Sequence, residues 1–359
     1  MTLKVMKVLQ ISPYFPPHVG GIEYHVKGLL DGLVERGYEV EVAASCGNSH
    51  AKFFRIPCID LLYFPVPLRF PRREADVYHS HVPSPTFAFC FKDAAPHVVT
   101  YHNDVVVPCR VNGHCLPRSL GGSLEWINRK LVRPVLDRAE IIIATTKSYA
   151  ETSPVLRDYF HKIEIVPNAV DTTIFQPGLS RDHYVLYVGR LVDYKGIEML
   201  LLAMRQVQNK ENLPLMMVGD GYDRSRFERI ASLMGLKIEF TGRVSRNKLI
   251  DLLSRAEMLV LPSTNRLEAF GIVLLEAMAC KTPVLAFDTP GVNEVARDGG
   301  MIFSETTELA EQILELHRDE SRRAALGERG RRAVREKYSW EKVLDKVESI
   351  YDEVTQCTM

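Results

Sequence analysis

Residues 7–44 read KVLQISPYFPPHVGGIEYHVKGLLDGLVERGYEVEVAA, and this stretch decides the fold. Its first six residues form a short apolar run that stops at a Pro-rich segment, which cannot continue a β-ladder. After Gly20 and Gly21, apolar residues recur at helical spacing until Gly37, and residues 39–44 resume an extended pattern. Strand, glycine turn, helix and strand make a βαβ unit, which predicts a parallel sheet.

The same order of elements recurs along the chain. Further strands are predicted at 77–81, 98–101, 141–144 and 163–166 and, after a loop-like stretch at 171–182, at 184–188, 215–218, 238–241, 258–262 and 283–287. Helices are predicted at 196–209, at 271–280 and from 308 onward, with a break at 338–340 before a last helix. The pattern predicts an α/β chain of two doubly wound halves.

The composition is that of a globular protein. At roughly 150 residues per domain, a chain of 359 residues favours two domains. The 45 basic residues balance 45 acidic ones, which disfavours a general nucleic-acid binder. No apolar run reaches the roughly 18 residues of a membrane span, and the first residues do not resemble a secretory signal, so we expect a cytoplasmic protein. Seven cysteines are an odd number, which favours reduced thiols, and Cys109, His114 and Cys115 lack the paired spacing of a zinc site.

Candidate binding residues follow the predicted strands, where ligands of open α/β sheets bind. Gly20 and Gly21 open a helix whose backbone amides can approach a phosphate, although a simple tight turn is the alternative. Arg190 and Lys195 lie in GRLVDYKG, directly after the strand at 184–188. A guanidinium fork and an ammonium suit a diphosphate, whereas two surface cations beside a helix start would oppose the helix dipole.

Two glutamates and a histidine complete the candidates. Glu268 and Glu276 enclose the sequence AFGIVLL, and Gly271 is predicted near a helix start, with Glu268 in the preceding loop. Each carboxylate can accept hydrogen bonds from a pair of hydroxyls, but a loop acid and a helix acid without a ligand are the alternative. His102 follows the strand at 98–101, where a packed histidine is the alternative to a catalytic one.

Together these motifs resemble the retaining family 4 glycosyltransferases of the GT-B fold, in which two Rossmann-like domains face each other across a cleft. The resemblance implies an acceptor-side domain at 1–175, a nucleotide-sugar-binding domain at 176–338 and a helix at 339–359 that crosses back to the N-terminal domain. It covers nearly the whole chain, in the family's order, through the stretches PYFPPHVGGIEYHVKGLLDGLVERGYEVEV, YHND, VPNAVD, YVGRLVDYKGIEMLL, MVGDGYDR, FTGRV and EAFGIVLLEAMACKTPV.

The resemblance also implies the reaction. A hexose would pass from a nucleoside diphosphate sugar, with UDP or GDP as the nucleotide, to an acceptor hydroxyl with retention at the anomeric carbon and without a metal or other cofactor. Arg190 and Lys195 would hold the diphosphate, Glu276 the ribose and Glu268 the donor sugar, against which His102 would lie. The implied catalytic residues are Arg190, Lys195, His102 and Glu268, and the implied donor-binding residues are Gly20, Gly21, Gly189, Arg190, Lys195, Val244, Glu268, Phe270, Gly271, Ile272 and Glu276.

The acceptor side has a second feature. Leu61–Arg73 reads LLYFPVPLRFPRR, which places apolar and aromatic residues beside arginines and suits a lipid or lipid-linked acceptor at the inner face of the membrane. A Pro-rich segment packed on its own domain is the alternative, and basic residues at 129, 130, 133 and 138 leave the same two interpretations open. A GT-B sugar-nucleotide epimerase or phosphorylase and a noncatalytic sugar-nucleotide sensor are the rival functions.

Overall fold

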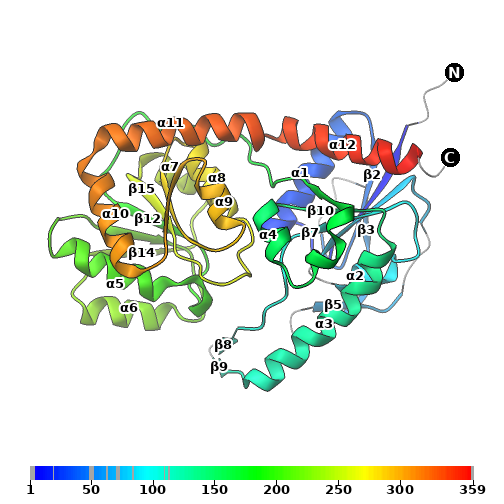
Figure 1. Cartoon of the computed structure of the whole chain (residues 1–359), viewed down its shortest axis with the longest axis horizontal. Coiled ribbons are helices and arrows are strands. Elements are labelled where there is room, and N and C mark those ends of the chain that lie inside the picture. The colour runs from blue at the N-terminus through cyan, green and yellow to red at the C-terminus, as the bar shows by residue number, and fades with distance from the viewer. Residues whose placement is uncertain are drawn as a thin grey trace. The chain divides into compact units, whose positions relative to one another are not determined.

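The computed structural model describes residues 5–18, 20–47, 52–61, 64–69, 73–82, 85–108, 110–111 and 114–356. The chain forms two compact units (Figure 1). The first contains Met1–Val107, Ser119–Asn168 and Trp340–Met359, and the second contains Pro108–Arg118 and Ala169–Ser339. Each unit has its own parallel sheet, as the βαβ pattern predicts.

The first unit is built on a seven-stranded sheet in the order β11-β10-β7-β6-β1-β2-β3. β1 pairs with β2 in parallel, with Lys7 opposite Glu39, so α1 is the crossover helix of the predicted βαβ unit. The strands are β1 (Lys7–Ile11), β2 (Glu39–Ala44), β3 (Lys52–Arg55), β6 (Val77–Val82), β7 (His97–Tyr101), β10 (Ile141–Ala144) and β11 (Ile163–Ile165), with a separate hairpin of β4 (Cys58–Leu61) and β5 (Phe64–Pro67). The helices are α1 (Gly21–Glu35), α2 (Pro85–Cys90), α3 (Arg118–Arg138), α4 (Lys147–Thr152), the 3-10 helix η1 (Leu156–Lys162) and α12 (Trp340–Gln356).

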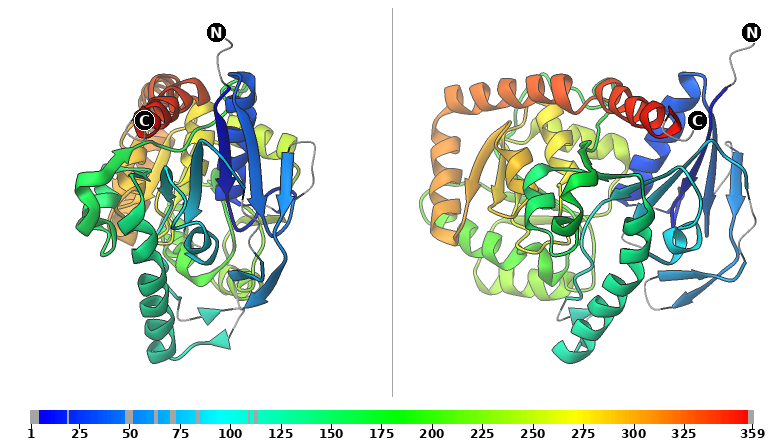
Figure 2. Two further views of the ribbon diagram at one scale, coloured as in Figure 1. Left: turned by 90° about the vertical axis from the view of Figure 1, so that its right-hand side faces the viewer. Right: turned by 45° about the vertical axis from the view of Figure 1, so that its right-hand side comes forward.

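The C-terminal helix α12 packs against α1 in this unit (Figures 1 and 2). Two glycines of α1 make room for it, because a Cβ atom at Gly28 would lie 1.9 Å from Cζ2 of Trp340 and one at Gly32 would lie 2.3 Å from a methyl carbon of Leu344. At the end of α1, Arg36 forms an ion pair with Asp345 at 2.9 Å. The last residues of the chain therefore complete the core that its first residues begin.

The second unit is built on a six-stranded parallel sheet in the order β14-β13-β12-β15-β16-β17. One face is covered by α7, α8, α9 and α11, and the other by α5, α6 and α10. The strands are β12 (Val185–Val188), β13 (Leu215–Val218), β14 (Ile238–Gly242), β15 (Met258–Leu261), β16 (Val284–Phe287) and β17 (Gly300–Phe303), and a short hairpin of β8 (Arg110–Val111) and β9 (His114–Cys115) also belongs to this unit. The helices are η2 (Asp193–Lys195), α5 (Ile197–Gln208), α6 (Arg224–Leu233), α7 (Arg246–Arg255), α8 (Ile272–Ala279), α9 (Val292–Ala296), α10 (Thr306–Arg318) and α11 (Glu320–Lys337).

The predicted α/β class and its strands are confirmed, each strand to within one residue at either end. The prediction did not include β17, because it begins at a glycine pair and has only four residues. Cys46, Cys58, Cys90, Cys115 and Cys280 are free thiols, whereas Cys109 and Cys357 lie outside the described residues. Among the described helices, none has the length and apolar character that crossing a membrane requires.

Candidate functional site

The first part of the candidate site lies at the carboxyl ends of β12 and β15 in the second unit. Gly189 and Arg190 follow β12, and the chain passes through η2 to Gly196, which precedes α5. Gly196 has a left-handed backbone, with φ of 69°, and a Cβ atom there would lie 1.9 Å from the carbonyl oxygen of Pro262. Only glycine fits this position, and its absent side chain lets the loop after β12 lie directly against the loop after β15.

This close approach joins the two predicted loops through an ion pair. The Lys195 ammonium contacts Glu268 Oε2, and their side chains are only 15% and 17% exposed. Ser263, directly beyond β15, donates a long hydrogen bond of 3.5 Å to the same carboxylate oxygen. Lys195, predicted at the diphosphate, and Glu268, predicted at the sugar, are therefore in direct contact.

Arg190 lies on the same loop and is exposed. It donates a hydrogen bond to the Tyr194 hydroxyl, and among the described residues it forms no ion pair with a carboxylate. The Arg190 guanidinium carbon and the Lys195 ammonium nitrogen each lie 5.8 Å from the centroid of the Tyr194 ring. The sequence analysis did not name Tyr194, although its position between the two cations in GRLVDYKG was a usable signal.

The N-terminus of α8 forms the next part of the site. Gly271 caps the helix in a left-handed conformation, with φ of 77°, and no side chain caps the first amides. Phe270 does not offer its ring, because the ring is buried against Tyr338 at a centroid distance of 6.0 Å. The backbone around Gly271 and Ile272 is thus the part of this motif that can donate hydrogen bonds to a ligand.

Glu276 lies in the second turn of α8. Burial raises the pKa of Glu276 from 4.5 to about 7, and the charge of Arg246 on α7 acts in the opposite direction. Its carboxyl group therefore changes protonation near neutral pH, unlike an exposed glutamate. Val244, the predicted neighbour of the base, follows β14 and packs partly buried against the core.

The first unit holds the remaining predicted residues. Gly20 caps α1 in an extended conformation, and the helix has no side-chain cap. Glu23 in the first turn is 7% exposed and hydrogen-bonds His18 Nδ1 at 2.7 Å. A Cβ atom at Gly20 would lie 2.3 Å from Glu23 Oε2, so a carboxylate stands beside the predicted phosphate-binding amides of Gly20 and Gly21. The sequence analysis did not consider this carboxylate.

His102 directly follows β7 and is 7% exposed. Its Nε2 lies 3.1 Å from His81 Nδ1 on β6, and His81 Nε2 lies 2.6 Å from the side-chain oxygen of Gln10 on β1. The Gln10 amide nitrogen donates to the Tyr351 hydroxyl of α12 at 3.1 Å. The hydrogen-bond chain that begins at His102 thus reaches the C-terminal helix of the same unit.

The donors along this chain specify the histidine tautomers. Because Gln10 presents its oxygen, His81 must carry its proton on Nε2, and His81 Nδ1 then accepts a hydrogen bond from His102 Nε2–H. The Tyr351 hydroxyl, which accepts from Gln10, is left to donate to His79 Nδ1 at 2.7 Å. Burial keeps the pKa values of His81 and His102 well below the usual value and lowers that of His79 to about 3, so all three rings are neutral at pH 7.

Comparison with known proteins gives matches to two family profiles and to curated relatives. The family profile described as Glycosyl transferases group 1 matches residues 170–333, and that of Glycosyltransferase Family 4 matches residues 19–174. A GDP-mannose-dependent monoacylated alpha-(1-6)-phosphatidylinositol monomannoside mannosyltransferase of Corynebacterium glutamicum is 31% identical over 96% of this chain and 97% of the relative. O-antigen chain mannosyltransferase C of Escherichia coli is 26% identical over 96% of this chain and 98% of the relative.

Solved structures share the fold at lower identity. Sucrose-phosphate synthase from Thermosynechococcus elongatus superimposes with a TM-score of 0.78 at 22% identity, over 98% of this chain and all of the other. Anabaena HepE in complex with UDP and glucose superimposes with a TM-score of 0.75 at 15% identity, over 97% of this chain and 99% of the other. On this evidence the chain belongs to the family 4, group 1 glycosyltransferases and has their GT-B fold.

Proposed function

We propose that this glycosyltransferase moves a hexose from a nucleoside diphosphate sugar to an acceptor hydroxyl with retention of configuration and without a metal. The observation that carries the proposal is the contact between Lys195 and Glu268 beside Arg190, at the carboxyl ends of two neighbouring strands. A diphosphate and a sugar together require a lysine, an arginine that has no carboxylate partner among the described residues, and open helix amides.

The ion pair has a role before the donor binds. In the free protein, Glu268 neutralises the Lys195 ammonium in a site where both are largely shielded from water. When the donor binds, Lys195 turns to the diphosphate together with Arg190, and Glu268 accepts hydrogen bonds from the sugar hydroxyls. Lys195 exchanges the carboxylate for the diphosphate, and Glu268 exchanges the ammonium for hydroxyl donors, so neither group is left without a hydrogen-bond partner.

During transfer, the bond between the anomeric carbon and the phosphate oxygen breaks, and the acceptor oxygen bonds to the same face. The acceptor proton passes to an oxygen of the departing diphosphate. Arg190 and Lys195 stabilise the negative charge that develops on this leaving group, which is the largest electrostatic demand of the reaction. Glu276 holds the ribose, Val244 flanks the base and His102 contacts the sugar, while Gly20 and Gly21 offer amides to the phosphate.

The relatives suggest which donor to test first. One is described as GDP-mannose-dependent and another as a mannosyltransferase, so GDP-mannose is the first candidate. UDP-glucose is the comparison donor, because a structure of similar fold contains UDP and glucose. A donor that binds only the folded protein raises its melting temperature, so a thermal-shift series ranks the nucleotide sugars before an acceptor is known.

The first prediction tests the two cations. Lys195→Ala and Arg190→Ala should each lower kcat with the best donor by about 100-fold or more, the scale of losing one charge-stabilising donor. Lys248→Ala is the matched control, because Lys248 is an exposed lysine of the same unit that pairs with Asp251. Unchanged turnover in both site variants would contradict the proposal. Nuclear magnetic resonance spectra of the product show whether the configuration at the anomeric carbon is retained. Conversion of the donor sugar in the absence of an acceptor would instead indicate an epimerase.

We also propose that the acceptor is a lipid, and the exposed side chains of α3 support this part of the proposal. This helix exposes Leu120, Trp126 and Ile127 at 49%, 59% and 47%, with the Lys130 ammonium 5.7 Å from the Trp126 ring centroid. We expect it to lie on an anionic membrane, with the apolar side chains inserted and the cations near the head groups.

Only part of the predicted basic face is available for this contact. Arg133 pairs with Asp158 and Arg138 with Asp93, whereas Arg129 and Lys130 have no acidic partner among the described residues. Of Leu61–Arg73, residues 62–63 and 70–72 lie outside the described residues, and Leu68 is 59% exposed. Co-sedimentation with anionic vesicles should be lost in Trp126→Ala, and absence of binding by the unaltered protein at low salt would exclude the membrane contact.

A further inference from the structure

A group of three possible metal ligands lies in the second unit, away from the loops described above. His183 precedes β12, Glu257 precedes β15 and His317 lies in the last turn of α10. β12 and β15 are neighbours in the sheet, with Val185 opposite Met258, so the residues before them meet at the amino ends of the strands. Arg190, Lys195 and Glu268 follow the opposite, carboxyl ends of these two strands.

The three side chains converge on one buried carboxylate. Glu257 Oε1 lies 2.5 Å from His183 Nδ1, and Glu257 Oε2 lies 2.8 Å from His317 Nδ1. The side chain of Glu257 is 1% exposed, that of His317 is 20% exposed and that of His183 is 78% exposed. One potential ligand atom from each residue lies within 4.8 Å of the others. The group is thus buried at the carboxylate and open to water at one imidazole.

The Glu257 carboxylate has no lysine or arginine partner among the described residues. Its ion-pair partners are the two histidines. Arg181 and Arg323 lie close by, but they donate to the backbone oxygens of Ala256 and His317 instead. A divalent cation bound between the three side chains would supply positive charge beside this buried carboxylate.

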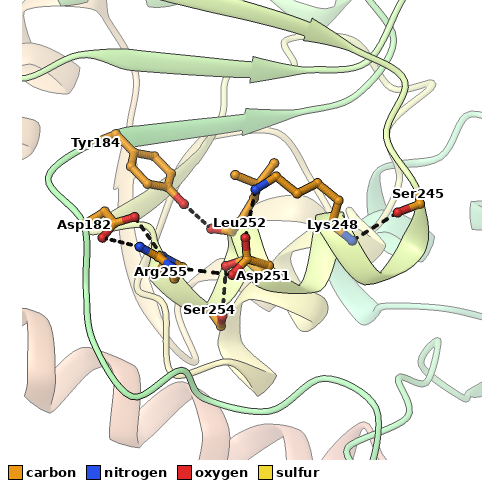
Figure 3. A network of polar contacts seen from close by, with 8 residues as sticks. All are labelled: Asp182, Tyr184, Ser245, Lys248, Asp251, Leu252, Ser254 and Arg255. Carbon is orange, nitrogen blue, oxygen red and sulfur yellow. Dashed lines mark hydrogen bonds and ion pairs between the residues drawn. The ribbon is translucent and has the colours of Figure 1, made fainter.

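The backbone around the group is held in place by a separate network (Figure 3). Arg255 binds both carboxylate oxygens of Asp182, at 2.8 and 2.9 Å, and the Asp182 amide donates to the Arg255 carbonyl at 2.7 Å. The Tyr184 hydroxyl donates to the Leu252 carbonyl at 2.7 Å, and the Glu257 amide donates to the Tyr184 carbonyl. The residues on either side of His183 are therefore fixed to α7 and to the start of β15, which positions two of the three ligands in advance.

We propose that His183, Glu257 and His317 form a Zn²⁺ site that links the starts of β12 and β15 to the end of α10. Two imidazole nitrogens and one carboxylate oxygen are ligands that Zn²⁺ accepts, whereas Mg²⁺ and Ca²⁺ prefer oxygen alone. On coordination, each neutral imidazole moves its proton from Nδ1 to Nε2, and a doubly protonated one releases a proton to solvent. Water takes the fourth position on the side of the exposed His183.

His183, Glu257 and His317 lie far apart in sequence and do not match the spacing of a metal-binding motif. The sequence therefore carries no signal for this site, and no metal was predicted. The site requires no change in the transfer reaction, which proceeds at the other end of the sheet and without a metal. Its expected effect is on stability, because an ion that binds only the folded protein shifts unfolding to higher temperature.

The test uses the full chain without a histidine tag, after treatment with a chelator. Calorimetric titration with ZnCl₂ should give one ion per chain. At about tenfold excess over the dissociation constant, the melting temperature should rise by about 3–6 °C. MgCl₂ at the same concentration should have no effect. His183→Ala and His317→Ala should each weaken zinc binding at least about tenfold, as expected when a ligand is lost.

His161→Ala is the matched control, because His161 is exposed and lies in the first unit. It should bind zinc as the unaltered protein does. His183 is exposed, so its alanine variant should fold even if His317→Ala does not. No zinc binding at about 100 µM would overturn the proposal. Unchanged zinc binding in His183→Ala would also overturn the proposal. His25, His81 and His102 form a second group of neighbouring imidazoles, so loss of zinc binding in His25→Ala would place the ion there and overturn the proposal as well.

Discussion

Glu276 is the ionisable residue whose environment bears most directly on activity. Burial raises its pKa to about 7, whereas the pKa values of His81 and His102 lie well below their usual value. The histidines stay neutral across the neutral range, so Glu276 is the group in the predicted site that titrates there. An ionised carboxylate can accept both ribose hydroxyls, whereas the protonated form has one acceptor oxygen fewer.

We predict that the donor KM falls about tenfold between pH 6 and 8, as Glu276 with a pKa of about 7 ionises. In Glu276→Gln, KM should be higher and nearly independent of pH over this range. The measurement is the initial rate against donor concentration at each pH. A variant that keeps the pH dependence of the unaltered protein would show that another group causes it.

The same residue has a consequence for stability. Its pKa of about 7 in the folded state lies above the unfolded value of 4.5, so the folded state binds more protons between these pH values. The free energy of unfolding should therefore fall as pH rises from about 4.5 to about 7, by about 3 kcal/mol at most, and stay level above. Denaturant unfolding of Glu276→Gln should lack this decline and show higher stability than the unaltered protein at pH 8.

The Tyr351 hydroxyl connects the hydrogen-bond chain from His102 to His79. Tyr351→Phe leaves the Gln10 amide nitrogen and His79 Nδ1 without this partner, at a cost of about 1–3 kcal/mol for buried polar groups. If Gln10 orients His81 and through it His102, kcat should fall while donor KM changes little. Nitrogen-15 spectra should show the Nε2–H tautomer of His81 in the unaltered protein. An Nδ1–H tautomer there would contradict this chain of donors.

At the scale of elements, the close contact of α1 with α12 depends on two glycines of α1, Gly28 and Gly32, which leave room for the side chains of α12. Gly28→Ala gains helix propensity but places a methyl group 1.9 Å from the Trp340 ring, and overpacking of this kind costs about 1–3 kcal/mol. Gly122→Ala is the control, because Gly122 lies in α3 of the same unit and a Cβ there meets nothing within 4 Å. The control should be neutral or slightly stabilising in thermal unfolding. Equal effects in both variants would contradict the packing argument.

The elements also show what local patterns can predict. β1, α1 and β2 were predicted almost residue by residue, because alternating and helical periods of apolar residues are local properties. The same was true of the loop after β12, where a glycine, two cations and a helix start stand close together in sequence. The hairpins and β3 were not predicted. β8 and β9 have only two residues each, β5 contains two prolines, and β3 reads KFFR, in which charged residues flank only two apolar ones.

At the scale of the whole molecule, the first unit needs the end of the chain. α12 buries Val343, Leu344, Val347, Ile350, Tyr351 and Val354. At roughly 1.5–3 kcal/mol for each buried apolar side chain, their combined loss of about 9–18 kcal/mol is as large as the typical total stability of about 5–15 kcal/mol.

A chain that ends at Ser339 should therefore lose the cooperative unfolding transition of the first unit and keep that of the second. Differential scanning calorimetry measures both transitions. Two unchanged transitions in the shortened chain would contradict the assignment of α12 to the core of the first unit.

The sequence by itself determined the α/β class, most of the strands and the loops that hold Arg190, Lys195, Glu268 and His102, because periodicity, glycines and strand ends are local. Three features arise from tertiary packing: Lys195 pairs with Glu268, the hydrogen-bond chain from His102 reaches Tyr351, and His183, Glu257 and His317 meet. The contacting residues are far apart in sequence: 60 positions separate Glu257 from His317, 73 separate Lys195 from Glu268, and 341 separate Gln10 from Tyr351. The physical reason is that sheet order and helix packing, which local spacing does not encode, set which distant side chains become neighbours.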